Sequence, residues 1–95
     1  MPAFVIVDIH IHDLQAYEKY KQLTPASIAA FGGRFVVRGG ATEIVEGDWK
    51  PGRLVVLEFD DMETARKWWS SESYEVAKKI RQSAASTNMI FVEGV

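Results

Sequence analysis

Two strand-like segments that are apolar on both faces constrain this fold more than any other feature. They are residues 4–11 (FVIVDIHI) and residues 54–59 (LVVLEF). A strand with one face in water should alternate apolar and polar side chains, and neither segment does so cleanly. The helices that the chain can form are only enough to cover one face of a sheet. We therefore expect another copy of the chain to cover the second face.

Size and composition limit the classes of function. The chain has 95 residues, so we expect one domain, residues 1–95. Its 13 acidic and 11 basic residues form no basic stripe, which argues against nucleic acid as a partner. There is no run of about 18 apolar residues and no basic leader, so we expect neither a membrane partner nor a signal peptide. Cysteine is absent, which excludes disulfides and thiolate metal sites, and we expect a cytoplasmic location.

Hydrophobic patterning and turn residues predict four strands. We expect them at residues 3–11, 34–46, 53–59 and 88–93. Gly39-Gly40 interrupts the second strand, where paired glycines are typical of a β-bulge.

Two helices lie between these strands. Asp13 is expected to cap the first helix, which should break at Pro25 because proline lacks an amide proton, and then resume. Gly32 should end it, since glycine accepts the left-handed conformation of helix ends. Asp60 is the expected cap of the second helix, and the serine-rich residues 70–73 should kink or restart it.

The element order β-α-β-β-α-β predicts a ferredoxin-like α+β fold. Right-handed crossovers turn this order into a four-stranded antiparallel sheet with two helices on one face. The first and third strands are then central, as their apolar character requires. Period-two parity predicts which side chains of these strands face the helices. They are Val5, Val7, Ile9, Ile11, Val55, Leu57 and Phe59. Apolar side chains on the opposite face predict a homodimer, and they are Phe4, Ile6, Leu54 and Val56.

A spaced set of residues resembles one known family. The set comprises Arg38-Gly39-Gly40, Glu46-Gly47-Asp48-Trp49, Pro51, Arg53, Glu58-Phe59, Ala65, Trp68, Ser71, Tyr74 and Arg81. It is similar to the domain of unknown function 1330 (DUF1330), a member of the dimeric α+β barrel superfamily. The resemblance implies a ferredoxin-like homodimer with facing sheets, and it implies no established reaction. The superfamily includes cofactor-independent monooxygenases, haem-degrading enzymes, muconolactone isomerases and effector-binding regulators. Trp69 departs from the pattern, where a smaller aromatic or polar residue is expected.

Asp8, His10 and Arg38 are the first candidates for a ligand site. We expect all three at one end of the open sheet face, where a dimer would enclose them. A carboxylate, an imidazole and a guanidinium together could bind an anion or move a proton. The simpler interpretation, which we favour, is an inter-strand or inter-subunit salt bridge between Asp8 and Arg38, with His10 as a satisfied interface residue.

Other polar candidates have simpler structural explanations. Glu58 shares the face of Asp8 but should lie toward the other end of the sheet. There a structural pairing, for example with an arginine of the partner chain, is favoured over catalysis. His10 and His12 face the same way, but without a clear third ligand we predict no metal site. A bulge that aims Arg38 explains Gly39-Gly40 better than a phosphate loop does.

Five aromatic residues are predicted on the helices. They are Tyr17, Tyr20, Trp68, Trp69 and Tyr74. Core filling is the favoured interpretation, and an aromatic pocket for a planar ligand, with Trp69 and Tyr74 as candidates, is the alternative.

Two functions remain open at this point. The first is a small enzyme or binding protein for a small organic acid or aromatic metabolite, acting without a cofactor. The second is a non-catalytic homodimeric module that binds a metabolite or has a structural role. Turnover would separate them.

Overall fold

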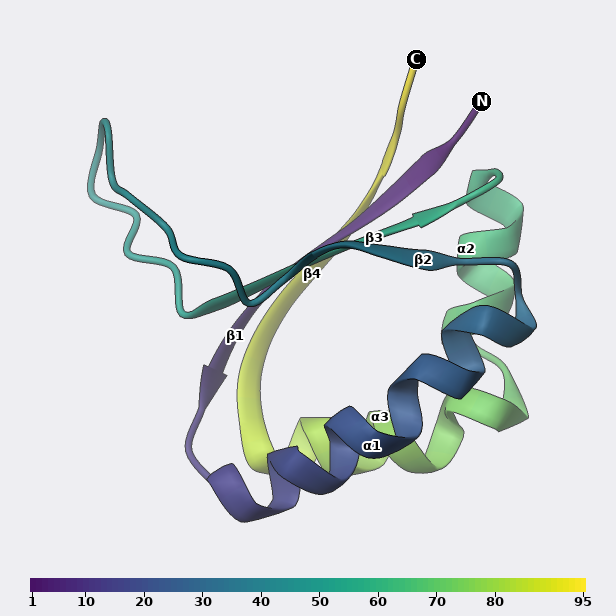
Figure 1. Cartoon of the computed structure of the whole chain (residues 1–95), viewed down its shortest axis with the longest axis horizontal. Helices are drawn as coiled ribbons and strands as arrows, with labels where there is room; N and C mark the ends of the chain where they lie inside the picture. The colour runs from purple at the N-terminus through teal and green to yellow at the C-terminus, as the bar shows by residue number, and fades with distance from the viewer.

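Four strands form one antiparallel sheet, and all helices lie against the same face of it (Figure 1). The computed structural model describes all 95 residues. In chain order, the elements are β1 (Ala3–Ile11), α1 (Leu14–Ala30), β2 (Arg34–Arg38), β3 (Arg53–Phe59), α2 (Met62–Trp69), α3 (Glu72–Ala84) and β4 (Ala85–Glu93). The strand order in the sheet is β2-β3-β1-β4. The ferredoxin-like prediction is confirmed, with β1 and β3 in the centre.

The core lies between the sheet and the helices. Val5, Val7 and Ile9 of β1 are buried there, as parity predicts, and pair across the sheet with Leu57, Val55 and Arg53. Four helical aromatic residues close the core from the other side, and they are Tyr17, Tyr20, Trp68 and Tyr74. Burying each aromatic side chain contributes more apolar area than any aliphatic one, so these residues dominate the packing.

The first helix is continuous, which corrects the predicted break at Pro25. Helix α1 runs from Leu14 to Ala30 with Pro25 inside it, and Asp13 caps it as predicted by accepting a hydrogen bond from the Ala16 amide. Proline removes one hydrogen bond, to the carbonyl of Lys21 four residues earlier. A hydroxyl supports the turn beside it, because Thr24 Oγ1 donates to the Tyr20 carbonyl at 2.7 Å.

The second predicted helix is two helices. Helix α2 ends at Trp69, and Ser71 begins α3 by accepting from the Tyr74 amide at 3.2 Å. The restart predicted at residues 70–73 is therefore confirmed, and the sheet is covered by three helices instead of two. Asp61, not Asp60, caps α2, because its carboxylate accepts from the Thr64 amide. None of the helices has the length and hydropathy needed to cross a membrane.

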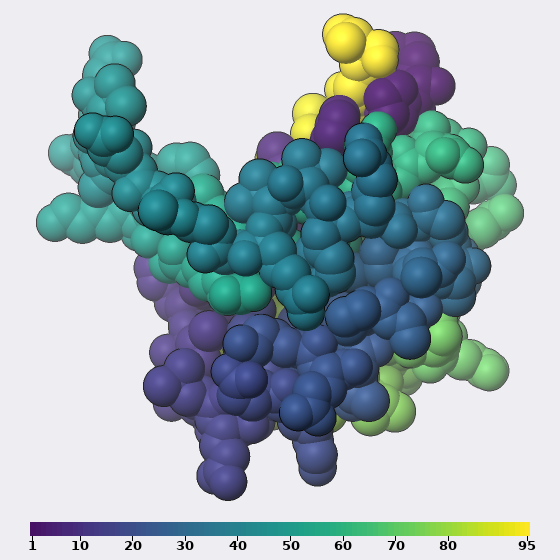
Figure 2. Space-filling model, viewed as in Figure 1, coloured from purple at the N-terminus to yellow at the C-terminus, as the bar shows by residue number.

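The second strand is much shorter than predicted. It ends at Arg38, and residues 40–52 form an arm that stands away from the body of the protein (Figures 1 and 2). The bulge lies between Phe35 and Val37 instead of at the glycines. Gly39 has φ +67° and ends the strand. Strand β4 starts at Ala85, three residues before the predicted start.

Gly39 and Gly40 should respond differently to substitution. A Cβ at Gly39 would meet the Arg53 guanidinium, and its positive φ disfavours any other residue. No atom lies within 4 Å of a Cβ at Gly40. We expect Gly39→Ala to lower the free energy of unfolding by at least about 1–2 kcal/mol, with little effect of Gly40→Ala, in chemical denaturation. Equal effects of the two substitutions would contradict the role given to Gly39.

Candidate ligand-binding site

A cavity of about 30 Å³ lies between the sheet and helices α1 and α2. Most of its wall is apolar and comes from all four strands and both helices. The apolar lining includes Ile9, Ile28, Phe35, Leu57, Trp68 and Met89. A volume of this size holds about two water molecules at roughly 10–15 Å³ each. A larger occupant therefore requires side chains at the edge of the cavity to move.

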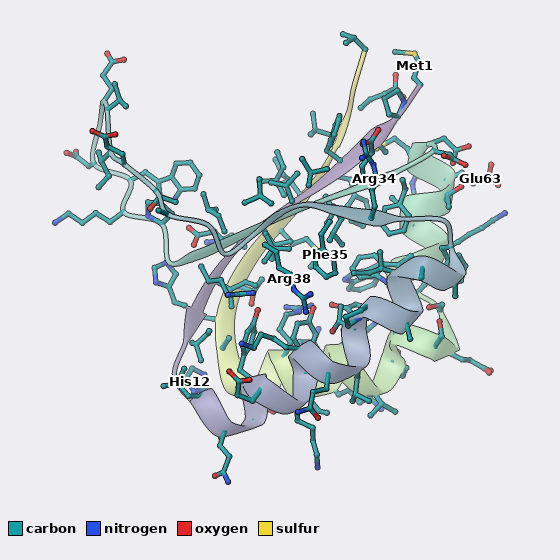
Figure 3. All side chains as sticks on the ribbon, viewed as in Figure 1. Met1, His12, Arg34, Phe35, Arg38 and Glu63 are labelled. Carbon is teal, nitrogen blue, oxygen red and sulfur yellow. The ribbon has the colours of Figure 1, made fainter.

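Arg38 is the movable side chain at the cavity edge. It is exposed, it lines the cavity, and its guanidinium carbon lies 4.4 Å from the centre of the Phe35 ring. Both residues point from β2 into the space between the sheet and α1 (Figure 3). Arg38 Nη2 donates a long hydrogen bond of 3.4 Å to the carbonyl of Lys21. This is the carbonyl that Pro25 leaves without its usual helical donor.

The bulge in β2 decides which way Arg38 points. Phe35 pairs with Leu57, and Arg38 pairs with Val55, although three positions separate Phe35 from Arg38 and only two separate their partners. The extra residue puts Phe35 and Arg38 on the same face, toward the helices. Without it, the alternation of a regular strand would place them on opposite faces.

Arg53 brings a second guanidinium to the same cavity. It pairs with Ile9 in the sheet and therefore faces the helices, with its guanidinium 5.8 Å from the centre of the Tyr17 ring. The Nε atom is buried and has no hydrogen-bond acceptor. The absence of a side chain at Gly39 makes room for this guanidinium. Neither Arg38 nor Arg53 has a carboxylate within 4.0 Å, since every ion pair involves other residues.

Tyrosine hydroxyls provide further polar groups near the cavity. Tyr17 and Tyr20 line it, and the Tyr20 hydroxyl lies 2.7 Å from the hydroxyl of Tyr74. Burial raises the pKa of Tyr17, although the nearby Arg53 charge opposes this effect. Burial, reinforced by Tyr74, raises the pKa of Tyr20 strongly. Both phenols therefore stay protonated at neutral pH and can act as hydrogen-bond donors.

Asp8 and His10 do not share a site with Arg38, which corrects that prediction. Asp8 pairs with Leu54 and Arg38 with Val55, so Asp8 and Arg38 lie on opposite faces of the sheet. The inter-strand salt bridge predicted between them is also absent. The reason is the bulge in β2, which the sequence pattern does not reveal.

Asp8 instead holds the base of the arm. It is 7% exposed and accepts hydrogen bonds from Trp49 Nε1 and from the Gly52 amide, both at 2.8 Å. His10 Nε2 lies 3.4 Å from the same carboxylate. Burial alone would raise the pKa of Asp8, but the hydrogen bonds from Trp49 and Gly52, with His10 nearby, lower it below its ordinary value. The carboxylate thus fixes Gly52, the residue immediately before the start of β3 at Arg53.

The other sequence candidates lie outside the cavity. Glu58 pairs with Arg34 of its own chain, where a partner-chain arginine was one expectation, and Arg34 Nε lies 3.0 Å from its carboxylate. Trp69 is partly exposed, with Lys78 Nζ 3.8 Å from the centre of its ring. Tyr74 is completely buried and does not line the cavity, but its hydroxyl is hydrogen-bonded to Tyr20, which does. His12 is exposed beyond the end of β1.

Arg53 was not predicted as a site residue. Core filling was the favoured interpretation of Tyr17 and Tyr20, with an aromatic pocket as the alternative. A signal for Arg53 was available. It has the same parity as Val55 and Leu57, so it is an arginine on a strand face that is otherwise apolar. A charged residue in that position needs either a partner or a ligand.

Replacing Asp8 should change how stability depends on pH. Because the folded-state pKa of Asp8 lies below its ordinary value of 3.8, the stabilisation is present above that pH and is lost as the pH falls through the folded value. Trp49 Nε1 and the Gly52 amide donate to different oxygens of the Asp8 carboxylate, and asparagine would keep only one of these two oxygens. We expect Asp8→Asn to cost about 1–3 kcal/mol at pH 7.

The check is chemical denaturation of both proteins from pH 7 down to about pH 2. The stability difference should shrink at the acidic end, where the wild-type carboxylate is protonated. A difference that stays constant over this range would contradict the role of the Asp8 charge.

Comparisons with known proteins agree with this architecture. The family model for the domain of unknown function DUF1330 matches residues 2–95. No curated protein matches the chain at a significant level.

Several solved structures share the fold. A protein of unknown function from Rhodopseudomonas palustris has a TM-score of 0.81 at 17% identity, covering 99% of this chain and 82% of that one. A dimeric ferredoxin-like protein of unknown function from Jannaschia sp. CCS1 has a TM-score of 0.75 at 8% identity, covering 99% and 100%. SnoaB, a cofactor-independent oxygenase from Streptomyces nogalater, has a TM-score of 0.69 at 16% identity, covering 99% and 93%. At these identities the similarity concerns the fold alone.

Proposed function

The chain belongs to the DUF1330 family, and we propose that it binds a small organic acid, aliphatic or aromatic, in the cavity between sheet and helices. The carboxylate of the ligand contacts Arg38 and Arg53, and its apolar part packs against the aliphatic and aromatic wall. The ligand reaches the cavity by displacing Arg38 and Phe35 at its edge.

One observation carries this proposal: two arginines without an acidic partner converge on an apolar cavity. A cation next to apolar surface loses hydration, and this loss is costly unless an anion compensates it. The two guanidinium groups also repel each other. Each presents a planar fork of donors that matches a carboxylate in a two-pronged arrangement. An anionic ligand would satisfy the buried Arg53 Nε and reduce the repulsion.

The lining residues favour binding over acid–base catalysis. No histidine, aspartate or glutamate lines the cavity. Its phenols are protonated at neutral pH and cannot serve as bases. What the cavity offers to chemistry is stabilisation of negative charge on a bound molecule. If the protein is an enzyme, we propose that it acts without a cofactor and uses only this charge stabilisation. The fold that it shares with SnoaB, a cofactor-independent oxygenase, supports this version of the proposal. The alternative is a binding module without turnover.

Replacing Arg38 should weaken binding of carboxylates. Lysine keeps the charge but cannot form the two-pronged contact. We expect Arg38→Lys to weaken the binding of small carboxylates by about tenfold, the equivalent of roughly one charge-assisted hydrogen bond. Calorimetry with benzoate and pentanoate on both proteins measures this effect.

A matched control is Arg66→Lys, which changes an exposed arginine on α2 that does not line the cavity. It should bind as the wild type does. If no carboxylate binds the wild type, or if both variants respond alike, the organic-acid proposal is wrong.

We also propose that the protein is a homodimer joined through the face of the sheet that the helices leave open. Ile90 is 58% exposed there, and other apolar side chains of the same face are partly exposed; they include Ile6, Val36, Val37, Val56 and Val92. An apolar patch of a few hundred Å² is typical of an interaction surface. The solved structure from Jannaschia sp. CCS1 is described as dimeric, which supports the proposal.

A charge in the centre of this face should prevent dimerisation. Val56 lies on the central strand β3, and Val56→Lys would bury an ammonium group between the sheets. We expect the wild type to sediment as a dimer at micromolar concentration and Val56→Lys as a monomer or unfolded chain. Val76→Lys, on the exposed side of α3, is the matched control and should remain dimeric. A wild-type monomer would contradict the proposed interface.

We further propose a cytoplasmic location. The support is the absence of cysteine, since a chain without disulfides gains nothing from an oxidising compartment.

A further inference from the structure

Arg81 is a buried cation without a carboxylate partner, outside the cavity itself. It is 4% exposed, and its Nε donates to the Tyr74 hydroxyl at 3.3 Å. No carboxylate lies within 4.0 Å of it. Tyr74 is completely buried and lies 2.7 Å from the hydroxyl of Tyr20. The three side chains form a polar chain that runs from α3 to the cavity wall, because Tyr20 lines the cavity.

The donors and acceptors available to these three side chains determine the direction of the hydrogen bonds between them. Arginine can only donate, so the Tyr74 oxygen accepts from Arg81. The proton of Tyr74 then has one acceptor, the oxygen of Tyr20. In the opposite arrangement Tyr20 would donate to Tyr74, and the Tyr74 proton would be left without an acceptor in a completely buried position. An unsatisfied buried donor of this kind is costly. The arrangement in which Arg81 donates to Tyr74 and Tyr74 donates to Tyr20 is therefore preferred.

This direction leaves the hydroxyl proton of Tyr20 without an acceptor in the protein. The bond to Tyr74 is the one well-formed hydrogen bond of this hydroxyl. Two other groups lie close enough to affect its pKa: Arg81, which can only donate, and the Thr24 hydroxyl, which donates its proton to the Tyr20 carbonyl. Because Tyr20 lines the cavity while Tyr74 and Arg81 do not, the missing acceptor belongs inside the cavity. The polar chain of hydrogen-bonded side chains begins at the positive charge of Arg81. Because aligned hydrogen bonds polarise one another, Tyr20 is a stronger hydrogen-bond donor than an isolated phenol.

We propose that Tyr20 donates this proton to a second oxygen of the bound acid, so that the ligand is an organic acid with a carbonyl or hydroxyl group remote from its carboxylate. This inference rests on the proposed function, in which Arg38 and Arg53 hold the carboxylate. The cavity thus recognises two groups of one small molecule, an anion at the arginines and an oxygen at Tyr20. Tyr74 and Arg81 are positioning residues, because they act through Tyr20. A plain aliphatic or aromatic acid satisfies only the arginines.

The experiment compares pairs of acids that differ by one oxygen group. The probes are 4-oxopentanoate with pentanoate, and 4-hydroxybenzoate with benzoate, measured by calorimetry. We expect the wild type to bind the oxygenated member of at least one pair about tenfold more tightly, as expected for one net hydrogen bond in a dry site. In Tyr20→Phe this ratio should fall to within about twofold, because the affinity for the oxygenated acid falls more than the affinity for the plain acid.

Two further variants separate the role of Tyr20 from a general change of the cavity. Tyr17→Phe removes another phenol from the wall and should keep the tenfold ratio. Tyr74→Phe should reduce the ratio partly, because it removes the proton donated to Tyr20. If Tyr20→Phe does not fold, Tyr74→Phe decides the question, and an unchanged ratio in that variant overturns the inference.

The outcomes distinguish this inference from the proposed function. If the wild type binds no carboxylate, both are wrong. If carboxylates bind and Arg38→Lys weakens them, but the wild type does not discriminate within either pair, the role of Tyr20 is wrong and the organic-acid site stands. The role of Tyr20 is also wrong, while the organic-acid site stands, if Tyr20→Phe keeps the ratio or if Tyr17→Phe abolishes it.

Discussion

The packing of the central strands against the helices is the constraint on which the rest of this structure depends. Val5, Val7 and Ile9 are buried on that side, and large aromatic side chains from the helices meet them. The Trp68 and Tyr74 rings lie 4.2 Å apart between their centres. Rings and branched side chains do not fill space perfectly around an arginine, and the small cavity lies where Arg38 and Arg53 enter this layer. The site is therefore a local departure from the core that stabilises the fold.

The sequence was sufficient for the features that depend on local pattern. The extents of β1 and β3, their central position and the side chains of β1 that face the helices follow from period-two alternation and element order. The Asp13 cap follows from residue type. These features could be predicted because each depends on a few neighbouring residues.

The composition of the site depends on features that the pattern does not encode. One extra residue in β2 turns Arg38 from the open face to the helix face, and a bulge near Val36 leaves no glycine as a sign. Sequence reasoning therefore identified Arg38 but gave it Asp8 and His10 as neighbours, whereas the structure gives it Phe35 and Arg53. A register shift by one residue changes every neighbour of a side chain.

Pro25 shows how a local irregularity contributes to the site. The proline was expected to break α1, because it removes a hydrogen bond to the Lys21 carbonyl. The helix tolerates it, and the freed carbonyl becomes an acceptor at the edge of the cavity, 3.4 Å from Arg38 Nη2. A long, exposed hydrogen bond of this kind is weak, so it orients the guanidinium while leaving it able to move. A ligand carboxylate is a stronger acceptor than a neutral carbonyl. The same arginine can thus rest on the helix when the cavity is empty and turn to an anion that enters it.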